Sequence, residues 1–211
     1  RKPPQHARDH EVADALIAAE AEGQVGHGFS RLGDYVAQLR SGKINPNAGI
    51  RTMSQYAASI LIDADCGFAY PALDAARSAV IPVAEDLGIA IVGITNSHHC
   101  GALSVQVDRI ARAGLIGLMV ANAPKAIAPW GAHEPLFGTN PIAFAVPRDG
   151  ADPLVIDLSL SKVARGKVMN AYKNGQDIPE GWALDAAGAP TTNAKAALEG
   201  TMLPIGGAKG T

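Results

Sequence analysis

The sequence predicts an α/β protein in which amphipathic helices alternate with short apolar strands. Apolar residues recur at helical spacing over residues 9–21, 31–41 and 104–113. Apolar runs without that spacing cover residues 88–94 and 115–122, and such runs are typical of strands covered on both faces. The strand at 88–94, the helix at 104–113 and the strand at 115–122 form a strand–helix–strand unit, a building block of this fold class. The direction of strand pairing stays open at this stage.

The other elements follow from the same criteria. A helix is expected after residues 65–71, continuing to about Leu87. Strands are expected at residues 142–146 and 154–157, and a further helix is expected to begin near Lys162. Residues 124–141 are rich in proline and glycine and predict a structured loop, whereas the turn-rich residues 174–194 predict an excursion at the surface.

The composition limits the possible partners and locations. The 211 residues are 47% hydrophobic and 18% charged, as in a folded protein with one or two cores. A net charge of −2 without a cluster of Lys and Arg argues against a nucleic-acid partner. No apolar run approaches the ~20 residues that span a bilayer, so no membrane partner is expected.

The cysteines and the two ends of the chain add two expectations. Cys66 and Cys100 lack CxxC spacing, which favours the reducing cytoplasm. No signal peptide opens the chain. The absence of a start methionine and the glycine-rich last residues indicate a fragment.

Two segments place imidazoles where proton transfer is possible. His98 and His99 follow the strand at 88–94, and side chains at a strand end can meet a ligand. His27 lies in the glycine-rich turn at 23–28 between two helices, and Arg31 follows one helical turn later. A proton donor beside a cation suits a substrate with a carboxylate. An ordinary surface histidine is the alternative interpretation of His27.

The common nucleotide-binding and hydrolase motifs are absent. The chain has no GxGxxG after a strand, no GxxxxGK[ST], no GxSxG and no HExxH. Two segments remain as candidates to hold the phosphate of a cofactor. One is the polar strand end at 157–161 with a helix N-terminus behind it, and the other is the turn at 206–210 with Lys209. Simple helix capping is the alternative for the first segment.

A zinc site is a competing interpretation of the histidines. His98, His99 and Cys100, together with His27 or His133, have the ligand types that zinc uses. Adjacent side chains seldom reach one ion, so we expect no metal. Cys100 is expected to pack as a small apolar residue.

Short motifs occur in order along nearly the whole chain. They are Gly26-His27-Gly28-Phe29-Ser30-Arg31, Asn96-Ser97-His98-His99, Phe137-Gly138-Thr139-Asn140-Pro141, Ile156-Asp157-Leu158-Ser159, Ala164-Arg165-Gly166-Lys167, Pro190-Thr191-Thr192, and Leu203-Pro204 to Lys209-Gly210. Together they resemble the type 2 malate/L-lactate dehydrogenase family. That family includes malate, sulfolactate and ureidoglycolate dehydrogenases, diketogulonate reductase and cyclic imino acid reductases.

The resemblance implies a fold, an activity and an assembly. It implies a non-Rossmann, mixed and largely antiparallel sheet with flanking helices, an oxidoreductase that uses NAD or NADP, and a homodimer. Residues 1–65 would form a helical region for substrate and dimer contacts, and residues 66–211 the cofactor-binding α/β domain. The C-terminal part of the family fold would be absent from this sequence.

The resemblance also implies roles for individual residues. His27 resembles the proton donor, Arg31 the clamp on the substrate carboxylate, and His99 the second active-site histidine, with the division of acid–base work between His27 and His99 left open. Thr139 and Lys167 are candidates for substrate contact. The positions that resemble cofactor contacts are Asn96, Ser97, His98, His99, Asp157, Leu158, Ser159, Ser161, Arg165, Gly166, Gly207 and Lys209.

Two departures from the family pattern bear on the substrate. Gly26 stands where the family often has serine, and Lys167 stands where cyclic imino acid reductases have aspartate. The lysine favours a small 2-hydroxy acid and its 2-oxo acid over a cyclic imine. The alternatives are a cyclic imino acid reductase, a non-enzymatic member that only binds dinucleotide, and a metal-dependent hydrolase that uses the histidine cluster.

Overall fold

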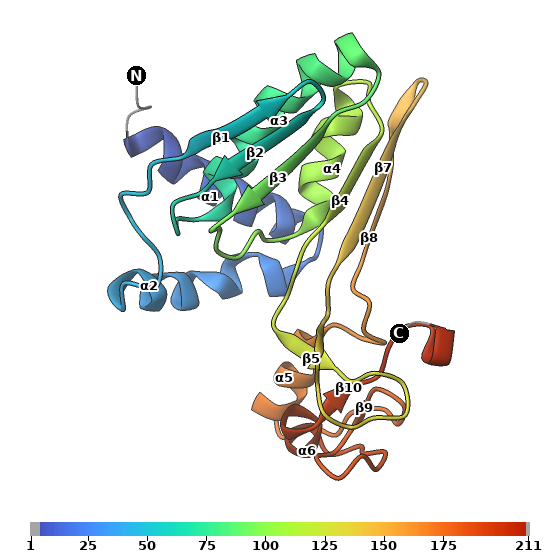
Figure 1. Cartoon of the computed structure of the whole chain (residues 1–211). Coiled ribbons are helices and arrows are strands. Elements are labelled where there is room, and N and C mark those ends of the chain that lie inside the picture. The colour runs from blue at the N-terminus through green and yellow to red at the C-terminus, as the bar shows by residue number, and fades with distance from the viewer. Residues whose placement is uncertain (1–4, 210–211) are drawn as a thin grey trace. The chain divides into compact units, whose positions relative to one another are not determined.

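The computed structural model describes the backbone of residues 5–209 and the side chains of residues 10–209. The chain divides into two compact units (Figure 1). The first contains the residues up to Gly117 together with 144–155, and the second contains residues 118–143 and those from 156 onward. The boundary expected after residue 65 falls inside the first unit.

The first unit is built on a three-stranded sheet with the order β1-β2-β3. Strands β1 (Arg51–Tyr56) and β2 (Ser59–Asp63) pair antiparallel as a hairpin, and β3 (Ile91–Thr95) pairs parallel with β2. Helix α3 (Ala69–Leu87) connects β2 to β3 and packs on one face of the sheet (Figure 1). Gly88 ends this helix in the left-handed region at φ +81°, so the strand begins later than predicted.

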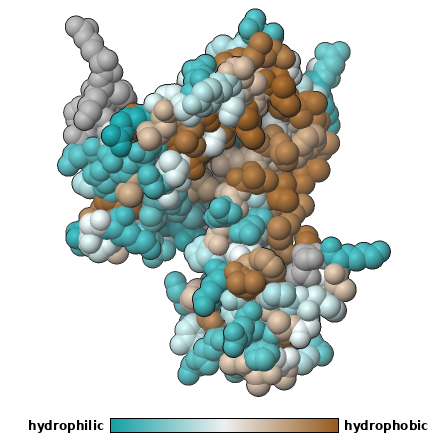
Figure 2. All heavy atoms as spheres, in the orientation of Figure 1, coloured by the Kyte–Doolittle hydropathy of each residue, from teal (hydrophilic) through white to brown (hydrophobic). Residues whose placement is uncertain are grey.

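The other face of this sheet is exposed, which corrects the expectation that β3 is covered on both sides. Val92 and Ile94 pack against the core under α3, but the Ile91 side chain is 67% exposed. Met53 and Leu61 on the neighbouring strands are exposed as well. Figure 2 shows apolar side chains gathered over the strands. The apolar run marked a strand correctly but did not determine how many of its faces are covered.

Three more α-helices and two short 3-10 helices complete the helical part of the first unit among the described residues. Helix α1 (Gln5–Ala21) is followed by η1 (Val25–His27), η2 (Phe29–Arg31) and α2 (Leu32–Arg40), and α4 (Leu103–Arg112) follows the loop after β3. Helices α1, α2 and α4 confirm the three amphipathic segments within a few residues at each end. Leu16 of α1, Tyr35 of α2 and Tyr70 of α3 share one buried cluster.

The second unit contains a four-stranded sheet with the order β6-β5-β10-β9. Its strands are β5 (Lys125–Ile127), β6 (Phe137–Gly138), β9 (Ala183–Leu184) and β10 (Thr201–Met202), and its helices are α5 (Arg165–Lys173), α6 (Ala194–Glu199) and η3 (Gly207–Lys209). Ile178 and Ala183 are buried in its core beside Val168 and Met202. The turn-rich segment 174–194 therefore contributes to the core and is more than the surface excursion expected.

Strands β4 (Gly117–Val120), β7 (Ile142–Arg148) and β8 (Ala151–Leu158) form a third sheet with the order β4-β7-β8. Three of the registered pairings elsewhere are antiparallel, β1 with β2, β5 with β6 and β9 with β10, and two are parallel. The mixed α/β fold with largely antiparallel pairing is thus confirmed. Across the described residues, no helix is both long and apolar enough to cross a membrane.

Candidate active site

His27 is held on a tight turn between α1 and α2. The Glu20 carboxylate accepts a hydrogen bond from the Phe29 amide at 2.9 Å, and the Ser30 hydroxyl donates to the Val25 carbonyl at 2.5 Å. A Cβ at position 28 would overlap the Glu20 carboxylate, so a larger residue there would displace the side chain that accepts from the Phe29 amide. The turn places His27 between two helices, as the sequence predicted.

Arg31 closes the same turn. Its Nε–H donates to the Gly26 carbonyl at 2.6 Å, and its Nη1 lies 3.7 Å from the Asp34 carboxylate. The side chain is one-third exposed. The Nε contact fixes the plane of the guanidinium, which leaves its Nη groups as donors for a planar carboxylate.

The loop that carries His98 and His99 is braced by a network around Asp63. The Asp63 carboxylate accepts hydrogen bonds from the Asp65 amide at 2.9 Å, the Asn96 side chain at 3.0 Å and the Arg51 guanidinium at 2.8 Å. These donors lower the pKa of Asp63 to about 2. The Asn96 side chain, a predicted cofactor contact, thus holds its own loop in place, with Asn96 itself at φ +51°.

The turn and the loop bring His27 and His99 together. Their rings stack with centroids 5.5 Å apart and planes 12° apart. Burial, Arg31, His27 and His98 lower the pKa of His99 to about 3. His99 is therefore a neutral imidazole at physiological pH.

Two buried tyrosines extend this site beyond what the sequence predicted. The Tyr35 hydroxyl lies 2.7 Å from Nδ1 of His99 and 2.9 Å from the Tyr70 hydroxyl. Burial raises the pKa of both phenols. Tyr35 lies in the segment 31–41, which the sequence predicts only as an amphipathic helix. The signal that could have found it is general, because a buried tyrosine hydroxyl needs a hydrogen-bond partner.

His98 lies in an aromatic cluster. Its ring meets those of Tyr35 and Phe68 edge to face at 6.1 and 6.3 Å. Burial and the nearby Lys43 lower its pKa. Ser97, the residue before it, is exposed.

In the second unit, the two candidate phosphate segments lie side by side. Residue Ser161 forms a β-bridge with Pro204, and the Ile205 amide donates to the Leu160 carbonyl at 2.8 Å. The Leu160 amide in turn donates to the Thr139 carbonyl at 2.8 Å. Thr139, the strand end at 157–161 and the turn that carries Gly207 and Lys209 are thus neighbours.

The donors in these segments fit an anionic group. Lys162 and Lys209 are exposed, and Ser159, three residues before Lys162, is partly exposed. Ser161 is different, because it is 2% exposed and its hydroxyl donates to the Val163 carbonyl at 2.8 Å. Arg165 donates to the Leu198 carbonyl at 3.1 Å, while Gly166 and Lys167 are exposed in the first turn of α5. Cations and N–H groups of this kind suit the phosphates of a dinucleotide.

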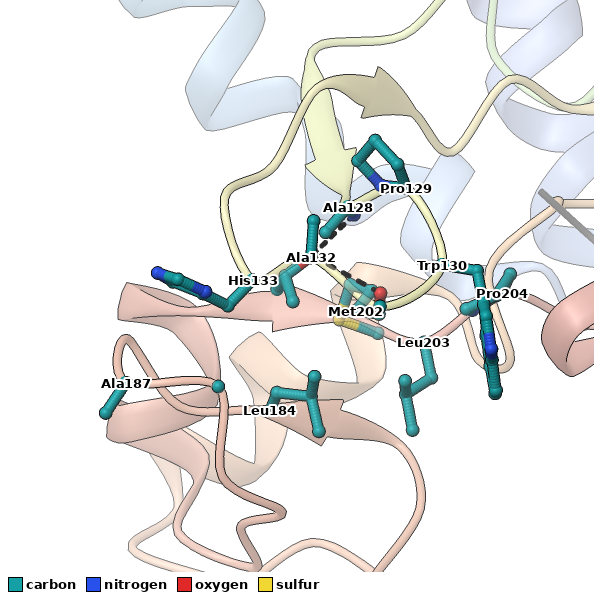
Figure 3. A pocket seen from close by; sticks show the side chains of 13 residues that line it. Ala128, Pro129, Trp130, Ala132, His133, Leu184, Ala187, Met202, Leu203 and Pro204 are labelled. Carbon is teal, nitrogen blue, oxygen red and sulfur yellow. Dashed lines mark hydrogen bonds between the residues drawn. The ribbon is translucent and has the colours of Figure 1, made fainter.

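A cavity of about 500 Å³ lies in the same unit, between the loop after β5 and strand β10. Trp130 lies beside Pro204 on one side of it and His133 on the other (Figure 3). The indole of Trp130 is 58% exposed, and a Cβ on Gly207 would lie 3.8 Å from it. The turn at Gly207 therefore adjoins the cavity.

The predicted site residues fall into two sets. The first unit contains His27, Arg31 and Asn96 to His99. The second unit contains Thr139, Asp157, Leu158, Ser159, Ser161, Arg165, Gly166, Lys167, Gly207 and Lys209. Within residues 10–209, no group of three or more His, Cys, Asp or Glu side chains is placed to hold a metal ion. The zinc interpretation thus lacks a ligand set in this part of the chain.

Comparison with known proteins gives the family. The sequence model of the malate/L-lactate dehydrogenase family matches residues 3–211. The chain belongs to this family, as the ordered motifs predicted.

Several relatives have assigned functions. The chain is 55% identical over 200 residues to the (2R)-3-sulfolactate dehydrogenase (NADP(+)) of Chromohalobacter salexigens, covering 94% of this chain and 60% of the relative. It is 45% identical to the Delta(1)-pyrroline-2-carboxylate/Delta(1)-piperideine-2-carboxylate reductase of Pseudomonas putida, covering 94% and 59%. The chain thus spans about three-fifths of the length of these relatives.

Solved structures show the same fold. The delta1-piperideine-2-carboxylate reductase of Pseudomonas syringae is 42% identical with a TM-score of 0.89, and 95% of this chain and 62% of that chain are covered. The sulfolactate dehydrogenase of Methanocaldococcus jannaschii is 34% identical with a TM-score of 0.86, with 95% and 58% covered.

Proposed function

We propose that the full-length protein interconverts a small 2-hydroxy acid and its 2-oxo acid with a nicotinamide coenzyme. The observation that carries the proposal is the stacked pair of His27 and His99 beside Arg31, in a member of this dehydrogenase family. The 55% identical relative named for sulfolactate and NADP(+) supports a sulfolactate-like substrate and NADP as the first candidates. Malate, lactate and NAD are the next candidates.

Arg31 binds and orients the acid in this proposal. A carboxylate beside the carbonyl of the substrate would take the Nη donors that the Gly26 contact leaves open. Two parallel hydrogen bonds then set both the position and the rotation of the substrate. Thr139 and Lys167 are the proposed further substrate contacts.

The two imidazoles act on the carbonyl oxygen of the substrate, where charge develops during the reaction. When bound, the reduced nicotinamide supplies a hydride to the carbonyl carbon. His27 gives a proton to the substrate oxygen during reduction and takes it back during oxidation. His99, neutral beside it, stabilises the same oxygen by a hydrogen bond or exchanges the proton in its place.

We further propose that the second unit contributes most of the cofactor contacts. The donors for phosphate are Ser159, Gly207, Lys209 and the first turn of α5 at Arg165 and Gly166. The strand end beside them is formed by Asp157, Leu158 and Ser161. Asn96 to His99 are the further proposed cofactor contacts. Residues 1–65 provide substrate and dimer contacts, residues 66–211 the cofactor site, and the protein acts as a homodimer in the cytoplasm.

A cyclic imino acid reductase is the second candidate, favoured by the 45% identical reductase. Lys167 favours a hydroxy acid as the substrate, since it stands where those reductases carry aspartate. The two activities differ in the substrate atom that is protonated, which is oxygen in one and nitrogen in the other.

The test follows nicotinamide absorbance with purified full-length protein. Sulfopyruvate, oxaloacetate, pyruvate and a cyclic imine are each offered with NADPH and with NADH. We expect turnover of an open-chain 2-oxo acid that disappears in His27→Ala and persists in the control His133→Ala, an exposed histidine of the second unit. Turnover of the cyclic imine alone would favour the reductase, and binding of dinucleotide without any turnover would contradict both activities.

A further inference from the structure

The two hydrogen-bond partners of Nδ1 determine which nitrogen of His99 carries the proton. The Gly101 backbone N–H points to Nδ1 at 3.3 Å, and the Tyr35 hydroxyl lies 2.7 Å from the same atom. A backbone N–H can only donate, so Nδ1 must accept and is unprotonated. A neutral His99 with a bare Nδ1 carries its hydrogen on Nε2.

The same constraint sets the direction of the tyrosine chain. Since Nδ1 accepts, the Tyr35 hydroxyl donates to it, and the oxygen of Tyr35 is then free to accept from Tyr70 at 2.9 Å. Both phenols are 3% exposed, so no bulk water competes for these hydrogen bonds. Tyr70 thus donates to Tyr35, and Tyr35 donates to His99.

Gly101 has a specific part in this arrangement. Its φ is +69°, and a Cβ at this position would lie 2.6 Å from the Tyr70 hydroxyl. Only glycine allows the backbone to pass this close to Tyr70 while its N–H points to His99. The Gly101 backbone and the Tyr35 and Tyr70 side chains therefore favour the same tautomer of His99, with the hydrogen on Nε2.

We infer that His99 acts as a neutral Nε2–H hydrogen-bond donor, positioned by Tyr70, Tyr35 and Gly101, and that His27 alone moves the proton. This inference rests on the proposed function and divides its chemistry between the two histidines. A proton added to His99 would have to enter at Nδ1, where the Gly101 N–H already points. Its low pKa, about 3, agrees with a group that keeps one hydrogen throughout.

In this scheme the proton count is simple. His27 transfers its proton to the substrate oxygen on reduction and regains one from water afterwards. The Nε2–H of His99 stays on its nitrogen and strengthens its hydrogen bond as negative charge develops on that oxygen. A fixed neutral donor of this kind stabilises the charge without a titration of its own.

The first experiment reads the tautomer directly. Long-range ¹H–¹⁵N spectra of the full-length protein, labelled with ¹⁵N-histidine and assigned with His99→Gln, distinguish the Nε2–H, Nδ1–H and doubly protonated rings. We expect a neutral Nε2–H ring for His99 at pH 7. In Tyr35→Phe the affinity of His99 for a proton should rise about tenfold, because the lost hydrogen bond had stabilised the neutral ring.

The control is Tyr56→Phe, which removes the hydroxyl of an exposed tyrosine and should leave the His99 spectrum unchanged. A doubly protonated ring or an Nδ1–H ring at pH 7 would overturn the inference. So would a Tyr35→Phe spectrum identical to that of the wild type.

The second experiment separates a donor from an acid–base group. A glutamine side chain can donate a hydrogen bond through a neutral N–H but cannot act as an acid or a base. A leucine side chain can neither donate a hydrogen bond nor act as an acid or a base. We expect His99→Leu to lower kcat by about 10²–10³ and His99→Gln to recover at least tenfold of that loss, with the pH profile of kcat/KM retained. Equal losses in both variants would refute the donor role.

The two experiments keep the inference apart from the proposed function. If the wild-type protein shows no turnover, the proposed function fails, and the spectra still decide the tautomer. If turnover is present and His99 carries its hydrogen on Nδ1, the inference fails and the proposed function stands.

Discussion

The buried neutral His99 predicts that the folded protein loses stability in mild acid. In the unfolded chain an imidazole binds a proton near pH 6.5, whereas in the folded protein the pKa of His99 is lowered to about 3. Between these values the unfolded state binds the extra proton, so stability rises with pH in this window and falls as the pH drops through it. Arg31, His27 and His98 face the ring and disfavour its cation, and the titratable Tyr35 hydroxyl lies 2.7 Å from its Nδ1.

The size of the effect follows from the shift. At pH 5 the unfolded imidazole is almost fully protonated and the folded one is not, which costs about 2 kcal/mol relative to pH 8, at about 1.4 kcal/mol for each pH unit below 6.5. Urea unfolding of the full-length protein at pH 8 and at pH 5 measures this difference. His99→Gln has no proton to gain, so its loss between the two pH values should be smaller by about 2 kcal/mol.

The comparison removes other contributions, because groups that do not interact with His99 titrate alike in both proteins and cancel. His133→Gln is the matched control, since it removes an exposed histidine and should behave as the wild type. Equal pH dependence in the wild type and His99→Gln would refute the assignment of a buried neutral imidazole.

Four further predictions test the surroundings of the site. Gly101→Ala should lower the free energy of unfolding by about 2 kcal/mol more than Gly42→Ala, since both positions have positive φ but only the first would crowd the Tyr70 hydroxyl; equal losses in urea unfolding would contradict the crowding. Tyr70→Phe should cost about 1 kcal/mol from one buried hydrogen bond and leave the Nε2–H tautomer of His99 in place, which unfolding and ¹⁵N spectra check together. Arg31→Lys should raise KM for the acid about tenfold or more, with a smaller change in kcat, because a point charge replaces a planar fork; an unchanged KM would remove Arg31 from substrate binding. Asp63→Asn should abolish a loss of stability that the wild type shows as the pH falls from about 4 towards 2, since the pKa of Asp63 is lowered to about 2 and its stabilising charge is present only above that range; identical acid unfolding curves would contradict it.

Part of this fold could be read from local patterns. The periodicity of α1, α2 and α4 placed those helices within a few residues, since a helix that buries one face repeats apolar residues every three or four positions. Short motifs made His27, Arg31 and His99 candidate site residues, and the order of those motifs predicted the family. The family match confirms the family, and the roles of the three residues stay predictions. These features depend on residues close together in the chain.

Other features depend on contacts that no local pattern records. An apolar run shows that β3 is a strand, but the Ile91 face is exposed because α3 covers only the opposite side. Residues 174–194 look like surface turns, yet Ile178 and Ala183 are buried because α5 and β10 close over them. Burial is a property of the neighbours and not of the residue alone.

The same distinction holds at the site. The sequence by itself determined the family through its ordered motifs, and it made the two imidazoles and the arginine candidates for the site because of their chemical types. The tertiary structure decided that Tyr35, 64 residues away in the chain, donates to Nδ1 of His99 and that Gly101 points its N–H at the same atom. The physical reason is that a tautomer is set by the donors around a ring, and folding alone brings those donors together.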